Sequence, residues 1–490
     1  MSRINTNVSS MLAQRVLGMQ NKGLTSSLER LSTGLRIARG ADDPAGLIAS
    51  ENLRAEKKAI GAAINNAQRA EQVVNVAEGG LQEINSLLTE LQGLVGATAN
   101  EAGVSAEEKE ANQLQIDSIL QTIDRIANST SFQGSKLLNG NFDYTTTGVA
   151  SSLTDVTVNS AKLADNATLN VNVTVLQSAQ TAEMYLSTAA TLANGGNGSI
   201  TLEVTGTKGV QQFTFASGTS QANIISAINS FKDAIGVSAA QSTVDNDRVE
   251  LRSTSYGSNA FVRVKKLQGT GGTSDIISAT VAGTTAGNTD VKDAGRDASV
   301  LINGVQATAT GLTGRVTSDG FDVSVTIDGV SALNVAGAST TFTITGGGAD
   351  FNLAPKVSLA SKVSLGIETV TTGNLGNAAS GFLSSLKSGG VANVVNGDLS
   401  KAQEVVESAI KQVSSLRGRL GAFQKNVVGA TINSLGVALE NTAAAESVIR
   451  DTDFASETAA LTRAQILSQA ATQSLSLANA QPQSVLRLLG

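Results

Sequence analysis

Apolar residues spaced alternately by three and four mark a long helical seam in the C-terminal part of the chain. Its members are Leu399, Ala402, Val406, Ala409, Val413, Leu416, Leu420, Phe423, Val427, Ala430, Val437, Ala444 and Val448. Ser434 and Asn441 are its polar interruptions. A heptad repeat held this long indicates coiled-coil packing. Such a helix would be about 75 Å long for roughly 50 residues, and it cannot bury its seam alone.

A matching seam near the N-terminus is the expected partner. It runs through Leu53, Ile60, Ala63, Ala67, Ala70, Val74, Ala77, Leu81, Ile84, Leu88, Leu91 and Val95. Asp43 followed by Pro44 predicts the N-terminus of this helix. Ser105 with Glu108 forms a capping-box pattern that predicts a third helix. The two ends of the chain should therefore come together, with the middle looped out between them.

The middle of the chain, from about 140 to 395, is rich in Thr, Ser, Gly and Val, which favours strands and turns. Period-two pairs such as Leu202 with Val204 and Val262 with Val264 predict strands. Ile224, Ile225, Ile228 and Phe231 have helical spacing. The sequence thus predicts an α+β fold. A long α-helical coiled coil or bundle forms from both termini, with inserted β-rich outer domains.

The missing residue types exclude much chemistry. The chain has no His and no Cys, so it lacks a Ser-His-Asp triad, a cysteine nucleophile and an ordinary zinc site. The formal net charge of -6 does not suggest a nucleic-acid partner. We expect no enzymatic activity, no cofactor and no metal. The uncharged stretch 464–486 is too polar to span a bilayer, so no membrane insertion is expected. Residues 1–20 lack the features of a cleaved signal peptide.

Three short patterns allow a functional and a plain reading. Asp451 and Asp453 could suggest a metal site, but a helix cap is favoured because no further ligands cluster nearby. Residues 269–274, with the sequence GTGGTS, have some features of a phosphate loop, but a flexible turn is favoured because no Lys follows. The Ser and Thr residues of the middle could be ordinary strand and loop residues or sites of O-glycosylation.

Both ends of the chain resemble bacterial flagellin. The N-terminal runs are SRINTNVSSMLAQRVL and LERLSTGLRIARGADDPAGLIASENL, within residues 2–53. The C-terminal run is AESVIRDTDFASETAALTRAQILSQAATQSLSLANAQPQSVLRLLG, residues 445–490. The resemblance is strong over about 1–142 and 396–490. It is weaker over 198–267, which resembles a β-rich insert of flagellins and hook-associated proteins, and over 347–367.

The resemblance implies a function, an architecture and partners. The chain would be a structural subunit of the flagellar filament that polymerises with many identical subunits for swimming motility. Residues 1–42 and 451–490 would form the inner helical domain, and 43–175 and 350–450 a helical bundle with a small β element. Residues 176–349 would form the variable outer domain. The implied partners are an export chaperone, the filament cap and hook-associated proteins. The implied location is extracellular, reached through flagellar type III export without a cleaved signal peptide.

The residues expected to mediate self-assembly lie on the two terminal helices. On pattern alone the heptad seams favour an intramolecular bundle, and the terminal motifs shift the outermost helices toward contacts between subunits. The N-terminal candidates are Ile4, Val8, Met11, Leu24, Leu28, Leu31, Leu35, Arg36 and Asp43. The C-terminal candidates are Phe454, Leu461, Ala464, Leu467, Ala471, Leu475, Val485 and Leu488. Arg36 and Asp43 are charged residues near the break after the first helix, and we hypothesise that they set lateral register.

Many flagellins carry a segment that a Toll-like immune receptor grips, with Arg at a central position. The matching segment here is 87–100, where Glu90 stands in place of that Arg and Leu94 is retained. The resemblance therefore implies weak receptor activation.

Other classes of protein compete with the filament subunit. The nearest alternative is a hook-filament junction protein, against which the ending NAQPQSVLRLLG argues. A flagellin with an inserted zinc protease would need an H-E-x-x-H motif, which this chain lacks. An adhesin role of the β-rich middle could coexist with the filament role.

Overall fold

The computed structural model describes residues 6–100, 103–164, 167–187, 199–216, 218–242, 248–268, 277–278, 290–378 and 380–489. For 187, 277–278 and 482–489 only the backbone is described. The chain forms two compact units. The first comprises residues 1–71, 352–361 and 423–490, and the second comprises 72–351 and 362–422. These units do not test the three-part division expected from the resemblance, which stays a prediction.

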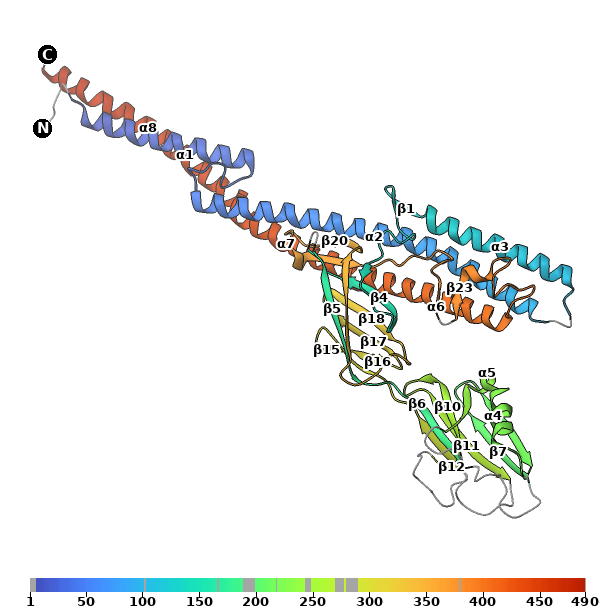
Figure 1. Cartoon of the computed structure of the whole chain (residues 1–490). Helices are drawn as coiled ribbons and strands as arrows, with labels where there is room; N and C mark the ends of the chain where they lie inside the picture. Colours follow the sequence, from blue (N-terminus) through green and yellow to red (C-terminus); the bar gives the residue numbers. More distant parts are fainter. Residues whose placement is uncertain are drawn as a thin grey trace. The chain divides into compact units, whose positions relative to one another are not determined.

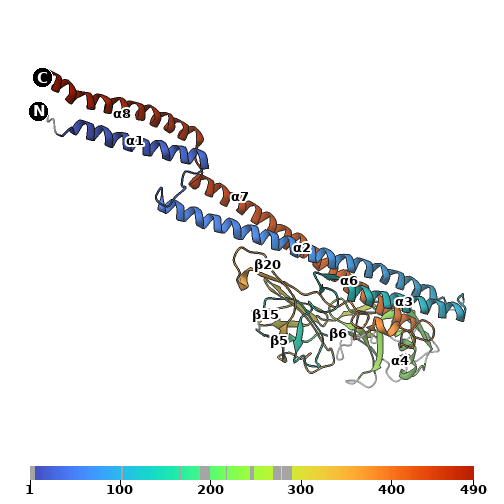
Figure 2. The same ribbon diagram turned by 90° about the horizontal axis from the view of Figure 1, so that it is seen from above.

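The first unit is built from helices that belong to both ends of the chain. These are α1 (Val8–Thr33), the first part of α2 (Pro44–Thr98), a π-helix (Phe423–Gly429), α7 (Ala430–Arg450) and α8 (Phe454–Leu489). Figures 1 and 2 both show α1 beside α8, with the start of α1 and the end of α8 at the same end of this pair. The predicted start of α2 is confirmed, because Gly46 N donates to Asp43 Oδ1 at 2.9 Å.

Helix α1 ends earlier than the spacing of its leucines suggests. Gly34 adopts the left-handed conformation at φ 72°, which an L side chain rarely adopts, and its N–H donates to Arg30 O. Leu35 therefore lies beyond the helix, in an isolated β-bridge with Asp451. The helical steps of Leu24, Leu28 and Leu31 are confirmed, but Leu35 does not continue them.

The helical part of the second unit contains the rest of α2, α3 (Ala106–Ser129) and α6 (Leu399–Ala422). The predicted capping box is confirmed, since Ser105 and Glu108 each bond the other's backbone N–H. The predicted seams are buried: Leu81, Leu88 and Leu91 of α2 and Val413 and Leu420 of α6 are each 0% exposed. Arg417 of α6 forms an ion pair with Glu78 of α2 at 3.6 Å.

The first β assembly of the second unit has two antiparallel sheets around one core. The strand orders are β15-β14-β5-β19-β3 and β16-β17-β18-β4. Phe342 of β19 is paired in register with Val171 of β5, and both are buried in this core. The strands are β3 (Thr145–Thr147), β4 (Leu153–Ala161), β5 (Leu169–Gln177), β14 (Ser299–Ile302), β15 (Val305–Gln306), β16 (Thr308–Thr310), β17 (Thr313–Ser318), β18 (Phe321–Ile327) and β19 (Ser339–Gly346).

The second β assembly has strand orders β12-β6-β10-β9 and β13-β11-β7-β8. The predicted pairs Leu202 with Val204 and Val262 with Val264 are buried in its core, together with Ile224 and Ile228 of the predicted helix. Phe231 lies beyond that helix and is 41% exposed. The elements are β6 (Thr181–Ser187), β7 (Ser199–Thr205), β8 (Val210–Ala216), α4 (Gln221–Asn229), α5 (Lys232–Ile235), β9 (Val237–Gln241), β10 (Arg248–Tyr256), β11 (Phe261–Gln268), β12 (Ile277–Ser278) and β13 (Asp290–Ala294).

Short elements connect these parts. They are β1 (Ser131–Phe132), β2 (Ser135–Lys136), β20 (Ala349–Asn352), β21 (Lys362–Leu365), β22 (Gly376–Asn377), β23 (Gly381–Phe382) and the 3₁₀ turns η1 (Leu359–Ser361) and η2 (Leu383–Leu386). The mixture of helical ends and a β-rich middle confirms the predicted α+β fold class.

The predicted C-terminal seam is only partly correct. Helical residues run from Leu399 to Arg450, as expected, but the stretch Phe423–Gly429 is a π-helix. Beyond it the predicted seam residues Val437 and Val448 are 59% and 81% exposed. A π-turn accommodates one extra residue, so every later position of the seam turns away from where a continuous α-helix would place it.

Asp143 gives the second unit a testable pH dependence. Burial, reinforced by the nearby Glu368 carboxylate, raises the pKa of Asp143. A raised carboxyl pKa favours the folded state below the unfolded pKa, and this advantage is lost as the pH rises through the folded pKa. Asp143→Asn should therefore melt at a higher temperature than the parent chain at pH 7, with the difference shrinking toward pH 4. Thermal melts across this range, followed by circular dichroism, check it; an unchanged difference at all pH values would contradict it.

Candidate assembly surface

Helices α1 and α8 form an antiparallel pair held by polar contacts along its length. Residues early in α1 meet residues late in α8, and the pairing advances in opposite directions along the two helices. The contacts are Asn7 Nδ2 to Ala478 O at 2.8 Å, Ser10 Oγ to Asn479 Oδ1 at 2.7 Å, Ser468 Oγ to Asn21 Oδ1 at 3.0 Å, and the ion pair of Arg30 with Glu457 at 3.7 Å. The pair is thus held in register by side chains.

The surface between the two helices is small and partly polar. In the described side chains of α1 and α8, the buried residues are Ser10, Ser27 and Ala471. Leu461, Ala464 and Leu475 of α8, and Leu24 and Leu31 of α1, are half-buried. They lie at heptad spacing with the buried residues. Small side chains let the two helices approach closely, but the pair encloses no apolar core of its own.

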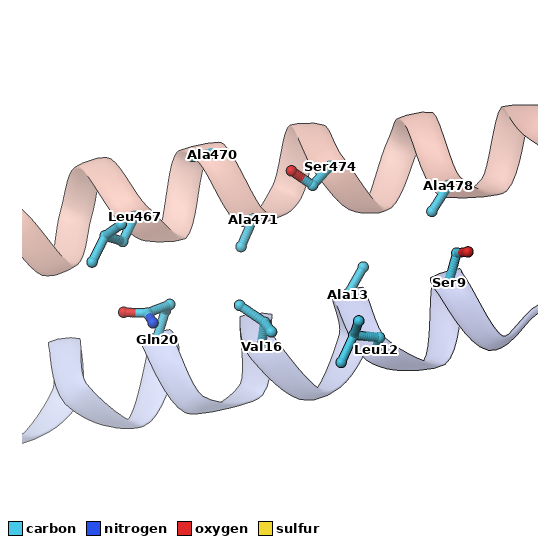
Figure 3. Close-up of a pocket in the computed structure, with 10 residues that line it drawn as sticks. All are labelled: Ser9, Leu12, Ala13, Val16, Gln20, Leu467, Ala470, Ala471, Ser474 and Ala478. Atoms are coloured by element: carbon cyan, nitrogen blue, oxygen red, sulfur yellow. The ribbon is translucent and has the colours of Figure 1, made fainter.

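Large apolar side chains instead stay exposed on both helices. On α1 these are Val8, Met11, Leu12, Val16, Met19 and Leu28, and on α8 they are Phe454, Ile466, Leu467 and Leu477; each is more than a third exposed. A groove of about 400 Å³ follows one side of the pair. Figure 3 shows Val16 and Ala13 pointing toward α8, and Ala471 and Ala478 pointing toward α1. An uncovered apolar surface of this kind indicates a contact site for another protein.

The structure divides the terminal candidates into two groups. Val8, Met11, Leu28, Phe454 and Leu467 lie on the exposed surface. Leu24, Leu31, Leu461, Ala464, Ala471 and Leu475 contribute instead to the contact between α1 and α8. Ile4 lies outside the described residues, and the side chains of Val485 and Leu488 are not among the described ones.

Sequence reasoning missed five exposed apolar residues on the pair: Leu12, Val16, Met19, Ile466 and Leu477. A signal for them was present. Each is a large apolar residue in a helical stretch, and each lies outside the heptad phase of the contacting residues. Apolar residues that do not fit the seam of a two-helix pair are free to contact a third helix.

Arg36 and Asp43 lie in the segment between α1 and α2, where the two ends of the chain meet. Arg36 N donates to Arg450 O at 2.7 Å, and its guanidinium donates to Ile449 O. Thr452 N in turn donates to Gly34 O at 2.9 Å. Asp43 caps α2. Both candidates thus have partners within the chain that fix the path from α1 into α2.

Asp453 is a helix cap, as favoured from the sequence. Its Oδ1 accepts from Ala455 N at 2.9 Å and from Ser456 N at 3.3 Å, at the start of α8. Among the described residues, no cluster of three or more potential metal-ligating side chains occurs. The GTGGTS stretch lies outside the described residues. No helix in the described part of the chain is both long and apolar enough to cross a membrane.

Glu90 and Leu94 lie one helical turn apart on α2. Glu90 is exposed and Leu94 is half-buried. The Glu90 carboxylate is therefore accessible to a protein that approaches this part of α2.

Known proteins match this chain at both ends and along its length. Residues 4–143 match the bacterial flagellin N-terminal helical region, and residues 403–489 match the bacterial flagellin C-terminal helical region. Flagellin A of Helicobacter pylori is 26% identical over 542 residues, with 99% of each chain covered. Flagellin C of Vibrio cholerae is 28% identical over 497 residues, again with 99% of each chain covered.

Among solved structures, FliC from Burkholderia pseudomallei is 15% identical with a TM-score of 0.25, covering 73% of this chain and 99% of that one. The flagellar cap protein FliD D1-D2-D3 domains from Escherichia coli are 16% identical with a TM-score of 0.27, covering 54% of this chain and 64% of that one.

The sequence matches define a structural protein of the bacterial flagellum. Both terminal regions match flagellin, and flagellins match over the whole length. The chain belongs to the bacterial flagellin family and is a structural subunit of the flagellar filament.

Proposed function

We propose that the chain polymerises with identical copies through the outer surface of the α1–α8 pair. The observation that carries this proposal is the row of exposed apolar side chains on both helices, among them Met11 at 66%, Ile466 at 61% and Leu477 at 68%. The pair buries almost no apolar side chain of its own. Covering these residues with neighbouring helices would stabilise a polymer at ~25 cal/mol per Å² of apolar surface.

A helical filament needs contacts between unlike surfaces of neighbouring subunits, because such contacts need not close into a ring. The exposed apolar residues of α1 and α8 differ, so the two helices present unlike surfaces to neighbouring copies. Arg36 and Asp43 hold the path between α1 and α2 and thereby set the direction in which α1 meets a neighbour. In this proposal 1–42 and 451–490 form the inner domain, 43–175 and 350–450 the helical bundle, and 176–349 the outer domain.

The proposal includes the route and the partners of the subunit. The chain leaves the cell by flagellar export, assisted by a chaperone, and acts in the extracellular filament beside cap and hook-associated proteins. It has no enzymatic role, in keeping with its membership of a structural family and its lack of His and Cys. Flagellin matches at both ends support a filament subunit over a hook-filament junction protein.

Seeded growth tests the assembly surface directly. Met11→Asp combined with Ile466→Asp places two charges on the exposed surface, so it should leave the monomer's helix content unchanged and abolish growth from filament seeds. Charges buried between subunits without partners are strongly unfavourable. Negative-stain electron microscopy measures filament length. Val330→Asp is the matched control, because Val330 is an apolar residue of the second unit that is 90% exposed. Filaments of normal length from the double variant would refute the proposal.

We further propose that Glu90 weakens recognition by the Toll-like receptor that grips this segment in many flagellins. Glu90 is exposed on α2, so a receptor would meet its charge directly. Purified monomer should activate reporter cells weakly. Glu90→Arg should lower the half-maximal concentration about tenfold, equivalent to about 1.4 kcal/mol. Glu90→Gln separates loss of the negative charge from gain of a positive one. Potent signalling by the unmodified chain would contradict this proposal.

A further inference from the structure

The π-helix Phe423–Gly429 interrupts the heptad phase of the long C-terminal helix. Phe423 is 7% exposed and Val428 is 0% exposed, so successive buried residues are five positions apart here. Everywhere else along this seam the steps are three or four. Short π-helical insertions inside α-helices often occur at functional sites.

Two alternative rows of residues follow the π-helix along α7. The first row continues the α-helical phase from Phe423, and its members are Val427, Ala430, Ser434, Val437, Asn441, Ala444 and Val448. The second row is shifted by one position, and its members are Val428, Thr431, Leu435, Ala438, Thr442, Ala445 and Ile449. We call these the outer row and the inner row.

The inner row faces α2 in this structure. Val428 is buried, Thr431, Leu435, Ala438, Thr442 and Ile449 are half-buried, and Ala445 is exposed, whereas every member of the outer row beyond Val427 is exposed. Two ion pairs flank the contact, Lys57 with Glu446 at 2.7 Å and Glu51 with Arg450 at 2.7 Å. The π-helix thus decides which row packs against α2.

Either row could pack against α2. Each has five aliphatic and two polar members, since Ser434 and Asn441 interrupt the outer row and Thr431 and Thr442 the inner one. The first-unit part of α2 offers small side chains, with Ala63, Ala67 and Ala70 buried at 0–1% exposure. Small residues on one helix form few deep holes for the side chains of the other helix. The other helix can therefore pack against them in more than one register.

We propose that the segment Phe423–Gly429 is a one-residue register switch for α7. With the extra residue held in the π-turn, α7 presents its inner row to α2 and leaves Val437 and Val448 on the surface. When the turn reverts to α-helix, α7 rotates by about 100° and moves by ~1.5 Å, so the outer row packs instead. The switch would also change the apolar surface that each subunit presents in a polymer. This consequence alone rests on the proposed function.

The chain has no Cys, so single cysteines report the register without background. Val437→Cys and Ala438→Cys are neighbours from the two rows. In the monomer, a maleimide should label Cys at 437 about fivefold faster than Cys at 438, because labelling follows local exposure. Ser434→Leu with Asn441→Leu completes the outer row using two exposed positions. In that background the ratio should invert. An unchanged labelling ratio would overturn the proposed switch, because even a completed outer row would then fail to replace the inner row against α2.

Deletion of Asn426 removes the extra residue itself. The shortened chain should keep its helix content by circular dichroism, and the labelling ratio should again invert. Asn426→Ala keeps the residue count and is the control, for which the original ratio is expected. Fast labelling at both positions, or loss of helix from the shortened chain, would show that the outer row cannot pack and would overturn the proposal. Both tests use the monomer, so their outcome is independent of whether Met11→Asp with Ile466→Asp blocks filament growth.

Discussion

A chain that ends at Arg450 should add no subunits to filament seeds, while the full chain extends the same seeds into long filaments. The truncation removes α8 and with it the exposed side chains of Phe454, Ile466 and Leu477. It also removes the partners of Asn7, Ser10 and Asn21, so α1 loses the contacts that hold its register. Isolated helices are only marginally stable in water unless tertiary packing supports them. Both halves of the assembly surface are therefore lost together.

The effect of losing α8 must be distinguished from general misfolding of the truncated chain. The second unit, comprising 72–351 and 362–422, has its own cores and does not include the deleted residues. Its calorimetric transition should therefore keep its midpoint in the truncated chain. If that transition is unchanged and growth is absent, the contacts lie in the deleted helix. Filaments from the truncated chain would place the assembly contacts elsewhere, and short rings from the full chain would favour a junction protein.

The helical ends were predictable because their seams are long. A heptad pattern over many turns leaves few alternatives, and caps such as Asp43 with Pro44 and Ser105 with Glu108 locate helix starts from sequence alone. The π-helix was not predictable, since both the outer and the inner row of α7 read as acceptable seams. Burial alone distinguishes Val437, which is 59% exposed, from its neighbour Ala438, which is half-buried.

The β-rich middle shows the same division between local and long-range information. Alternation identifies strands, and Leu202 with Val204 points into a core as expected. The order of strands does not follow from alternation, because it depends on pairings such as Phe342 with Val171 that join distant segments. The assembly surface was predictable only in part. Apolar residues on α1 were visible, but which of them face α8 depends on a partner helix from the other end of the chain.

Phe342→Ala should strongly destabilise the first β assembly without affecting filament growth. Phe342 is 1% exposed in the core shared by two sheets. Removing a buried aromatic ring costs about 3–5 kcal/mol, from lost transfer free energy and from the cavity left behind. Domains are stable by only about 5–15 kcal/mol, so a large part of the margin disappears. The proposed assembly surface belongs to the other unit and should keep its contacts.

Calorimetry is the suitable measurement for Phe342→Ala, because a chain with more than one unit need not unfold in a single step. The transition of the second unit should move to a clearly lower temperature, while seeded growth well below that temperature proceeds at the parental rate. Phe231→Ala is the matched control: this ring is 41% exposed, so its removal should shift the transition far less. Loss of growth from Phe342→Ala with the β core still folded would show that the outer sheets contribute to subunit contacts, contrary to the proposed division of roles.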